Sequence, residues 1–341
     1  MARKSLPTKE FTGSFYRIGW LKGQALKNSL RPPQAGEREV EFALRCFESL
    51  RDVYPPMVRE VEGMLDASEL PRASFLVEYF ARHVPMGACT GVAVLPAATR
   101  DSNTIIGRNY DWVASDRQWC QAWYSKPDHC HAVLSYTHHW AGSPDGVNDH
   151  GLFISLFSLG RGRPPRGHGL QWNLLIDLVL YTCTSVEEAV GLLTGVPHLR
   201  AFSYLIADAE GNAALVEALP DPITVRQPED NRLIATNCVV GEEMKKAICQ
   251  ARHDRAQNLL QPRLGTVDRD LVQTILADHE APICEGDHTK TEAERAERND
   301  HQTLWSLICM PQTQELAIAP GLPCQTQYRS LSFKGRKRRP S

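Results

Sequence analysis

Apolar residues recur at helical intervals in the first part of the chain. Between residues 16 and 70, positions such as Val61 and Leu65 follow one another at steps of three or four, which is the spacing of one buried helix face. The pair Pro55-Pro56 interrupts this pattern, because proline ends or begins a helix. We therefore expect a helical leader in two pieces, divided at the prolines.

After Pro85 the pattern changes to short runs rich in β-branched residues and separated by turn-forming residues. The run Ala-Glu-Gly-Asn at 209–212 carries a hairpin signal between two of them. Together these patterns predict strands at 91–95, 104–107, 132–136, 151–158, 203–208, 213–218 and within 303–319.

Helical patterns separate these strands. Residues 174–181 are apolar, and Ser185 followed by Glu188 is the signature of a helix N-terminus. A second helix is expected over 242–260, and the charged stretch 285–302 is expected to be a surface loop or short exposed helix. Hairpins, a helical pair and hairpins again favour an α+β fold, a layered αββα sandwich, over a parallel doubly wound sheet.

Composition and charge exclude several classes of protein. With 42% hydrophobic and 23% charged residues, the 341-residue chain is neither disordered nor fibrous. Its 38 basic and 40 acidic residues provide no global field for nucleic acid or an anionic membrane, so we expect neither partner. Neither a GxGxxG motif nor a P-loop occurs, and we expect no cofactor.

The sequence also indicates a compartment. It lacks an apolar run long enough to span a bilayer, and its first ten residues lack a secretory pattern. Its ten cysteines are scattered without a CxxC pair, which favours reduced thiols and a cytoplasmic location. The basic run 334–339 is expected to be a solvated chain end, with a localisation or polyanion-binding tag as the alternative.

The candidate chemistry centres on Cys89, which stands where the helical leader gives way to the first predicted strand. The small residues Gly87, Ala88 and Gly91 surround it. A cysteine at a strand start is usually structural, but the run 107–112, Gly-Arg-Asn-Tyr-Asp-Trp, places an arginine and an aspartate in a strand-to-loop turn one hairpin later. Antiparallel pairing would return both toward the thiol, where a cation lowers its pKa and a carboxylate can orient an amine.

Residues 88–90 (Ala-Cys-Thr) and 107–112 together resemble the acyl-coenzyme A:6-aminopenicillanic acid acyltransferase family, also called the C45 peptidases. These belong to the N-terminal-nucleophile hydrolases and are relatives of the choloylglycine hydrolases. The resemblance implies a four-layer αββα sandwich of antiparallel sheets and extends over roughly residues 16–323. Further segments resemble the family in the same order, at 146–152, 205–217, 235–237, 252–260 and 303–321.

The resemblance implies a precursor that cuts itself at the Ala88–Cys89 bond. Residues 1–88 would then be a helical segment that remains a partner of the catalytic part, residues 89–330, and residues 331–341 would be a basic tail. The freed α-amine of Cys89 would have a pKa near 7.7–8.0. It could take the proton from the thiol of the same residue, so no catalytic histidine would be needed.

Further roles follow from the resemblance. Asp111 would orient the ammonium of the nucleophile, and Arg108 would keep the thiolate or polar substrate groups in register. Asn237 is the candidate oxyanion donor, because a side-chain amide can stabilise a tetrahedral oxygen. Asn148 and Arg252 are candidate substrate contacts, with a turn residue and a solvated helix charge as the respective alternatives.

Two positions depart from the family pattern. Ala88 stands where glycine is usual, which bears on the rate of self-cleavage, and Cys238 replaces a usual histidine beside the candidate oxyanion donor. The implied function is hydrolysis of a linear C–N amide bond in a small N-acyl or aminoacyl amine, through an acyl-thioester on Cys89. The alternatives are N-acyl transfer from acyl-coenzyme A, and an unprocessed, non-catalytic scaffold.

The histidines and cysteines allow two other interpretations. A papain-like arrangement is disfavoured, because the sequence around Cys89 lacks that family's flanking pattern. A histidine-rich patch, comprising 129–131, 138–139 and His150, lacks the usual zinc spacings. Successive side chains of a strand also point to opposite faces, so we expect no metal site.

Overall fold

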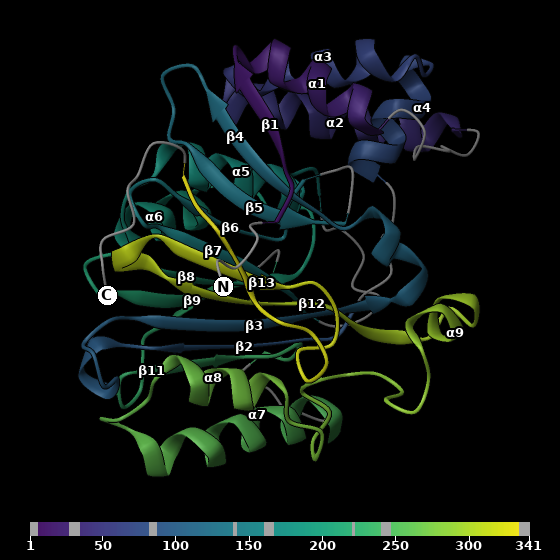
Figure 1. The fold of residues 1–341 in the computed structure, drawn as a ribbon. Helices are drawn as coiled ribbons and strands as arrows, with labels where there is room; N and C mark the ends of the chain where they lie inside the picture. Colours follow the sequence, from purple (N-terminus) through teal and green to yellow (C-terminus); the bar gives the residue numbers. More distant parts are fainter. Residues whose placement is uncertain are drawn as a thin grey trace.

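Two β-sheets stack face to face, and helices cover both outer faces (Figure 1). The computed structural model describes residues 6–26, 35–81, 87–138, 142–159, 167–219, 222–239 and 247–333. The larger sheet has, in spatial order, strands β1 (Thr8–Gly13), β4 (Gln121–Pro127), β5 (Val133–Thr137), β6 (Asp145–Asn148), β7 (Phe153–Ser158), β8 (Phe202–Ala207), β9 (Ala213–Ala218) and β10 (Ile223–Arg226). The smaller sheet has strands β11 (Arg232–Ala235), β2 (Cys89–Val94), β3 (Ile105–Val113), β12 (His301–Met310), β13 (Glu315–Ala319) and β14 (Arg329–Leu331). The predicted αββα sandwich is confirmed.

The helices form the two outer layers. Helices α5 (Trp172–Thr182) and α6 (Val186–Gly195) pack on the larger sheet, whereas α7 (Ala247–Leu260) and α8 (Arg269–Leu276) pack on the smaller one. The N-terminal helices are α1 (Phe15–Leu26), α2 (Glu37–Val53), α3 (Pro55–Ser68) and α4 (Arg72–Leu76), and a short α9 (Glu292–Glu297) precedes β12. No helix in the described ranges is both long and apolar enough to cross a bilayer.

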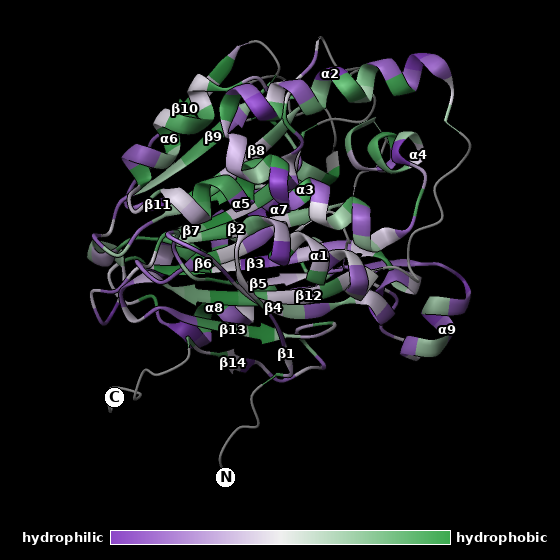
Figure 2. Ribbon diagram, turned by 90° about the horizontal axis from the view of Figure 1, so that it is seen from above, coloured by the Kyte–Doolittle hydropathy of each residue, from purple (hydrophilic) through white to green (hydrophobic). Residues whose placement is uncertain are grey.

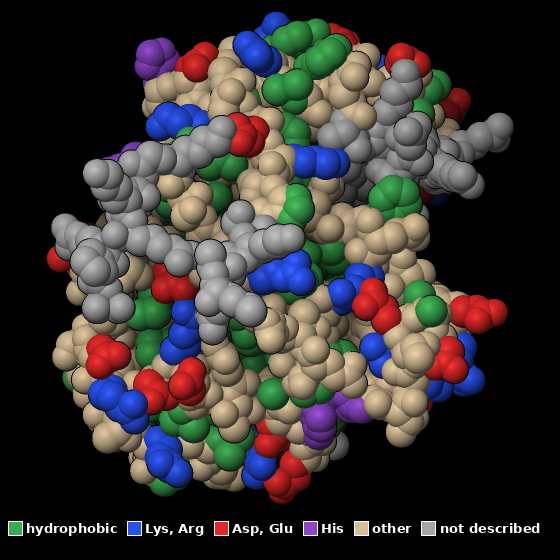
Figure 3. Space-filling model, viewed as in Figure 1, with side chains coloured by type: hydrophobic (Ala, Val, Ile, Leu, Met, Phe, Trp, Pro, Cys, Tyr) green, Lys and Arg blue, Asp and Glu red, His purple; other side chains and the backbone are tan. Residues whose placement is uncertain are grey.

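The central core lies between the two sheets and contains aromatic rings from both. Tyr110 of β3 stacks on Trp305 of β12 with ring centroids 4.1 Å apart, and Tyr136 of β5 meets Trp305 edge-on. Figure 2 shows hydrophobic residues concentrated along the strands, whereas hydrophilic and hydrophobic residues alternate along α2. Burial of apolar strand faces therefore drives the stacking of the sheets. On the face seen in Figure 3, basic and acidic side chains are interspersed, in keeping with the near-neutral composition.

The helical leader and its division at the prolines are confirmed, but the stretch contains three helices, α1 to α3, instead of the two predicted pieces. Pro55 occupies the first position of α3, where its missing N–H costs nothing. The leader is tied to the rest of the fold in two ways. Strand β1 pairs with β4, and the buried Lys22 of α1 contacts Glu60 of α3 at 2.6 Å and Asp177 of α5 at 3.1 Å.

Several local predictions were wrong or incomplete. Strand β1 was not predicted because Phe11 is its one buried residue, and its parallel pairing with β4 departs from the predicted all-antiparallel sheets. The run 107–112 is not a strand-to-loop turn, since β3 continues through it to Val113. Residues 331–333 belong to the fold rather than to the tail, because Leu331 pairs in β14 and Phe333 is buried. Residues 334–341 lie outside the described ranges.

Other predicted elements are confirmed. Helix α6 begins after Ser185, whose hydroxyl accepts a hydrogen bond from the Glu188 N–H at 3.2 Å. Strands β8 and β9 flank the predicted hairpin turn, and the charged stretch forms the short helix α9. Helix α7 is confirmed from residue 247 onward, whereas residues 240–246 lie outside the described ranges.

Candidate active site

The candidate nucleophile Cys89 opens strand β2, and its side chain is buried. In the β2–β3 hairpin Cys89 lies opposite Tyr110, and Gly91 lies opposite Arg108. Directly opposed residues share a face of the sheet, so these four residues all face the larger sheet. Gly91 is required there, because a Cβ atom at this position would come within 2.4 Å of the Phe157 ring.

Arg108 holds the sulfur from this inner face. Its Nη2 atom lies 3.3 Å from Cys89 Sγ and donates a 2.7 Å hydrogen bond to the Leu156 carbonyl. Its Nη1 atom forms a 2.5 Å ion pair with Asp145 Oδ2, and both side chains are fully buried. The guanidinium is therefore fixed by three partners, one of which is the candidate nucleophile.

Asp145 of β6 is a site residue that the sequence analysis missed. Besides Arg108, its carboxylate accepts hydrogen bonds from Ser155 Oγ at 2.6 Å and Trp305 Nε1 at 3.1 Å. Burial raises the pKa of Asp145, and the Arg108 charge opposes this shift. The sequence contained one signal: an acidic residue lies close before an apolar, strand-like run. Buried acidic residues are rare unless they are paired.

Asp111 and Arg252 lie on the other face of the smaller sheet. The Asp111 carboxylate accepts a 2.6 Å hydrogen bond from the Thr303 hydroxyl, and its second oxygen lies 3.6 Å from Arg252 Nη1. Burial raises the pKa of Asp111 well above its ordinary value, the nearby Glu285 raises it further, and Arg252 opposes both. From the sequence, Thr303 was expected in a closing strand, without a role in the site.

Arg252 projects from α7 and is buried. Its Nη1 atom donates to the Cys89 carbonyl at 3.0 Å and to Thr90 Oγ1 at 3.2 Å, whereas Nη2 donates to Asn237 Oδ1 at 3.1 Å. It is therefore not the solvated helix charge considered as an alternative. These contacts go to the protein itself, so in this structure Arg252 braces the start of β2 from behind.

The Ala88–Cys89 peptide bond has a hydrogen-bond partner on each side. The Ala88 carbonyl accepts from the Asp111 backbone N–H at 3.0 Å, and the Cys89 N–H donates to Asn237 Oδ1 at 2.6 Å. Asn237 Nδ2 in turn donates to the carbonyl and the hydroxyl of Ser158 at 3.1 and 3.0 Å. Ser158, at the end of β7, is another site residue that the sequence did not indicate.

The thiol lies in an environment that disfavours its charged form. Burial raises the pKa of Cys89 to about 11; the Arg108 charge opposes this shift, and Asp111 adds to it. Among the described side chains, the hydrogen-bond partner of the sulfur is Arg108 and not a histidine. Before any cleavage the sulfur is therefore a protonated thiol near neutral pH.

Asn148 lies apart from this cluster. Its side-chain amide donates to the carbonyls of Leu180 and Cys183 at 3.1 and 2.7 Å, and its oxygen accepts from the N–H groups of His150 and Leu152. These contacts fix the turn after β6 against the end of α5. These contacts match the alternative interpretation, in which Asn148 is a turn residue.

The histidine-rich patch is only partly brought together. His131, Asp149 and His150 place one possible ligand atom each within 4.8 Å of one another. His139 lies outside the described ranges. His138 instead lies against Tyr110 and Trp112 in the central core.

Comparison with known families identifies the family of this chain. The sequence profile of the acyl-coenzyme A:6-aminopenicillanic acid acyl-transferase family matches residues 98–321. The chain belongs to this family. It is thus an N-terminal-nucleophile enzyme, a hydrolase or acyltransferase that acts on amides.

Distant similarity to solved structures accompanies the family match. Penicillin V acylase from Agrobacterium tumefaciens has 14% sequence identity and a TM-score of 0.47, over 68% of this chain and 83% of that one. The C2A mutant of conjugated bile acid hydrolase from Clostridium perfringens has 12% identity and a TM-score of 0.48, over 72% and 97%. A Caenorhabditis elegans orthologue of N-acylethanolamine-hydrolyzing acid amidase has 15% identity and a TM-score of 0.47, over 66% and 93%. No curated protein matches the sequence.

Proposed function

We propose that this enzyme matures by cutting its own chain at Ala88–Cys89, and then hydrolyses a linear amide of a small N-acyl or aminoacyl amine. The observation that carries the proposal is the set of contacts around this one peptide bond. Its carbonyl accepts from the Asp111 N–H, its N–H donates to Asn237, and the adjoining sulfur lies beside Arg108.

Self-cleavage begins when the Cys89 sulfur attacks the Ala88 carbonyl carbon. The Asp111 N–H, already bonded to that carbonyl oxygen, stabilises the negative charge that develops on it. The C–N bond then breaks, and the proton lost by the thiol ends on the departing nitrogen. Water hydrolyses the resulting thioester, which leaves a carboxylate on Ala88 and a free α-amine on Cys89.

Turnover uses this new amine as the base. With a pKa near 7.7–8.0, roughly a tenth to a sixth of this amine is neutral at pH 7 and can accept the thiol proton. The thiolate attacks the substrate carbonyl, and the protonated amine then delivers its proton to the leaving amine. Water resolves the acyl-thioester on Cys89, which releases the acid and regenerates the thiol.

Asn237 and Asp111 hold the new amine terminus in this proposal. Asn237 Oδ1 already accepts from the Cys89 nitrogen and would keep that contact after cleavage. The proposed oxyanion role of Asn237 needs an Nδ2 hydrogen, and both are engaged by Ser158 in the uncut chain. Substrate must therefore displace one of them, and the Ser158 hydroxyl is the partner that can rotate away. Asp111 supports an ammonium electrostatically from the opposite face.

The two sides of the cut would remain together as partners. Strand β1 and helices α1–α4 precede the cut, yet β1 pairs with β4 and the buried Lys22 reaches Asp177 in the catalytic part. We place the mature enzyme in the cytoplasm, since none of its ten cysteines, all of which are described, forms a disulfide. Hydrolysis is preferred over transfer from acyl-coenzyme A because it needs no second specific site.

Intact-mass spectrometry tests maturation directly. Purified protein is expected as two masses, residues 1–88 and 89–341, with Cys-Thr-Gly-Val as the new N-terminus. Cys89→Ala should give one uncut mass and no turnover, whereas Cys130→Ala, a half-buried thiol outside the site, should be cut normally. An uncut wild-type chain that hydrolyses amides would overturn self-processing, and an uncut, inactive chain would favour the scaffold.

A competition assay separates hydrolysis from transfer. The cut enzyme is given a phenylacetyl or short-chain acyl amide with and without a competing amine, and the free acid and new amide are measured. Hydrolysis predicts mainly free acid in both cases. Amide formation that outpaces acid release would favour the acyltransferase, and the same assay with acyl-coenzyme A as donor would identify its substrate.

A further inference from the structure

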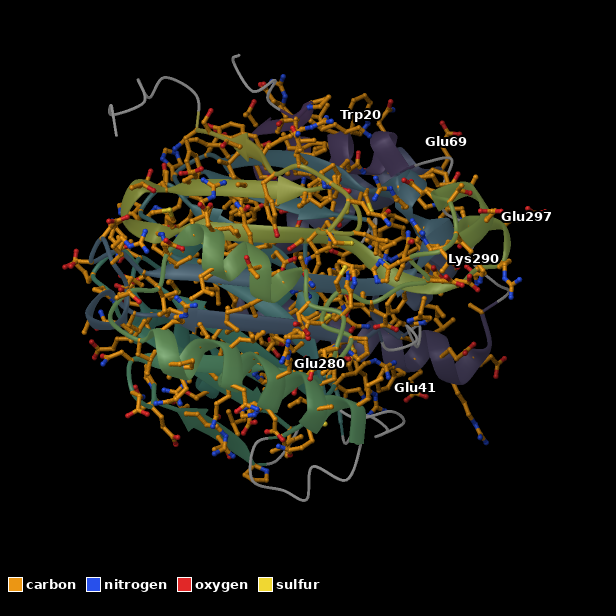
Figure 4. All side chains as sticks on the ribbon, turned by 60° about the horizontal axis from the view of Figure 1, so that its bottom comes forward. Trp20, Glu41, Glu69, Glu280, Lys290 and Glu297 are labelled. Atoms are coloured by element: carbon orange, nitrogen blue, oxygen red, sulfur yellow. The ribbon has the colours of Figure 1, made fainter. Side chains whose placement is uncertain are left out.

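A cluster of metal-ligating side chains lies outside the active site. His279, Cys284 and His288 come from the segment between α8 and α9, and Cys324 comes from the loop between β13 and β14. One possible ligand atom from each lies within 4.8 Å of the others. Figure 4 labels two residues of the first segment, Glu280, which follows His279, and Lys290, which lies two residues after His288. Two thiols and two imidazoles form a donor set typical of structural zinc.

The distances fit a tetrahedral ion. With Zn–S bonds near 2.3 Å and Zn–N bonds near 2.0–2.1 Å, tetrahedral angles require sulfur atoms about 3.8 Å apart and sulfur–nitrogen pairs about 3.6 Å apart. Cys284 Sγ and Cys324 Sγ are 3.7 Å apart, and Cys324 Sγ lies 3.6 Å from His288 Nδ1. Cys324 Sγ therefore already stands at the separations from Cys284 Sγ and His288 Nδ1 that one shared zinc ion imposes.

The surroundings of the cluster also suit a metal. His288 Nε2 lies 3.2 Å from the Cys284 carbonyl oxygen, so a proton on Nε2 leaves Nδ1 free as a ligand. Ligating histidines generally donate their other N–H to a carbonyl or carboxylate in this way. The Cys284 N–H is held by the Asp278 carbonyl at 2.9 Å, and Arg255 of α7 clamps the Asp278 carboxylate. The exposed His279 stacks on His288 with ring centroids 3.9 Å apart, and its ring can turn to provide the fourth ligand.

The geometry points to a structural Zn²⁺ site formed by His279, Cys284, His288 and Cys324. The site links the segment after α8 to the loop before β14. All four positions are filled by side chains, which is the arrangement of a structural rather than a catalytic zinc site. Thiolate and imidazole ligands favour zinc over the oxygen-preferring Mg²⁺ and Ca²⁺.

This site would also support the active site from behind. Glu285 directly follows Cys284, and its backbone N–H donates to Thr303 Oγ1 at 3.0 Å while its carbonyl accepts from the Thr303 N–H at 2.8 Å. The same Thr303 hydroxyl donates to Asp111. A zinc ion would thus fix the segment that positions Thr303, and through it the Asp111 carboxylate.

The first test measures metal content in untagged, full-length protein produced in zinc-containing medium. We expect about one zinc per chain by mass spectrometry of the elements, as a four-ligand site requires. Cys284→Ser and Cys324→Ser should each lower zinc affinity by at least about 10–100-fold, and His279→Ala should lower it less, because the His279 ring stacks on His288 and has to turn to reach the ion. Cys120→Ser, which replaces a thiol outside the cluster, should retain the metal.

A second measurement keeps the test decisive if a variant fails to fold. Stripped wild-type protein is titrated with Co²⁺, which should produce the visible absorption of tetrahedral sulfur coordination, and Zn²⁺ should displace it. Removal of the metal should lower the unfolding temperature, and zinc should restore it. These readouts do not depend on amide hydrolysis.

Two outcomes would overturn the site. One is zinc-free protein whose cobalt titration shows no sulfur coordination. A Cys284–Cys324 disulfide found by non-reducing mass spectrometry in such protein counts as the same outcome. The other is zinc that persists in Cys284→Ser and Cys324→Ser but is lost in His150→Ala, which would assign the metal to the cluster of His131, Asp149 and His150 instead.

Discussion

Replacing Asp145 by leucine removes the buried countercharge of Arg108 while keeping four side-chain heavy atoms with the same branching. Both partners are fully buried and lie 2.5 Å apart, so the variant leaves the guanidinium charge in the core without its carboxylate. Removing one member of a buried ion pair costs about 3–5 kcal/mol. Ser155 and Trp305 also lose their acceptor, which places the expected loss at the upper end of this range.

A double-mutant cycle with Arg108→Met isolates the interaction. Four chains are compared by urea unfolding followed by tryptophan fluorescence, all carrying Cys89→Ala so that none is cut. The double variant should be less destabilised than the sum of the single variants, with a coupling of about 2–3 kcal/mol, because it contains no lone buried charge. Additive effects within about 0.5 kcal/mol would refute the view that Asp145 exists to hold Arg108 in the core.

Three further predictions concern Cys89, Lys22 and Thr303. Self-cleavage should accelerate about tenfold per pH unit between pH 7 and 10. The reason is that burial raises the pKa of the attacking Cys89 thiol to about 11, so the thiolate fraction grows with pH over this range. Timed gel assays measure the rate of cutting, and a pH-independent rate would contradict thiolate attack. Lys22→Met should release the N-terminal fragment of the cut enzyme at a lower urea concentration. The free energy that holds the two fragments together should fall by about 3–5 kcal/mol, because the variant leaves two carboxylates without their buried cation. Lys126→Met, whose half-exposed ion pair spans 3.8 Å, is the control and should change little. Thr303→Val should reduce both cutting and kcat, because Asp111 loses a donor that lowers its pKa, whereas Thr303→Ser should retain most activity.

Local patterns were sufficient to predict the layers of the fold. Alternating and apolar runs locate most of the central strands, because burial of one or both faces determines which residues a strand can carry. Strand β1 escaped detection for the opposite reason: it is an edge strand with Phe11 as its one buried residue. Its pairing with β4 depends on a contact more than 100 residues away, which periodicity does not encode.

The candidate site likewise contains some residues that the local sequence predicts and others that it does not. Cys89, Arg108 and Asp111 could be found because they lie on one hairpin, where short-range pairing returns them to the nucleophile. The partners that fix them come from distant segments. Asp145 and Thr303 are brought in only by the stacking of the two sheets and by the pairing of β12 with β3.

The zinc cluster shows the limit of spacing rules. Its first three ligands lie within ten residues, but the fourth, Cys324, follows 36 residues after His288. Neither pair of like residues has a familiar zinc spacing. The strands β12 and β13 close that gap, so the cluster becomes visible only when the sheet is assembled.

The proposed switch from precursor to enzyme can be judged by its energies. A thiol with a pKa of about 11 and an amine with a pKa near 8 differ by about 3 units, so moving the proton from sulfur to nitrogen costs about 4 kcal/mol if the two groups do not interact. They do interact, because both belong to Cys89: opposite charges about 4 Å apart attract by about 4 kcal/mol at an effective dielectric constant near 20. The two terms cancel, so the ion pair becomes accessible once the amine exists, with Arg108 beside the sulfur to favour it further. The peptide nitrogen of the uncut chain cannot accept this proton, so the cut gives the buried sulfur a proton acceptor for turnover that it lacks during self-cleavage.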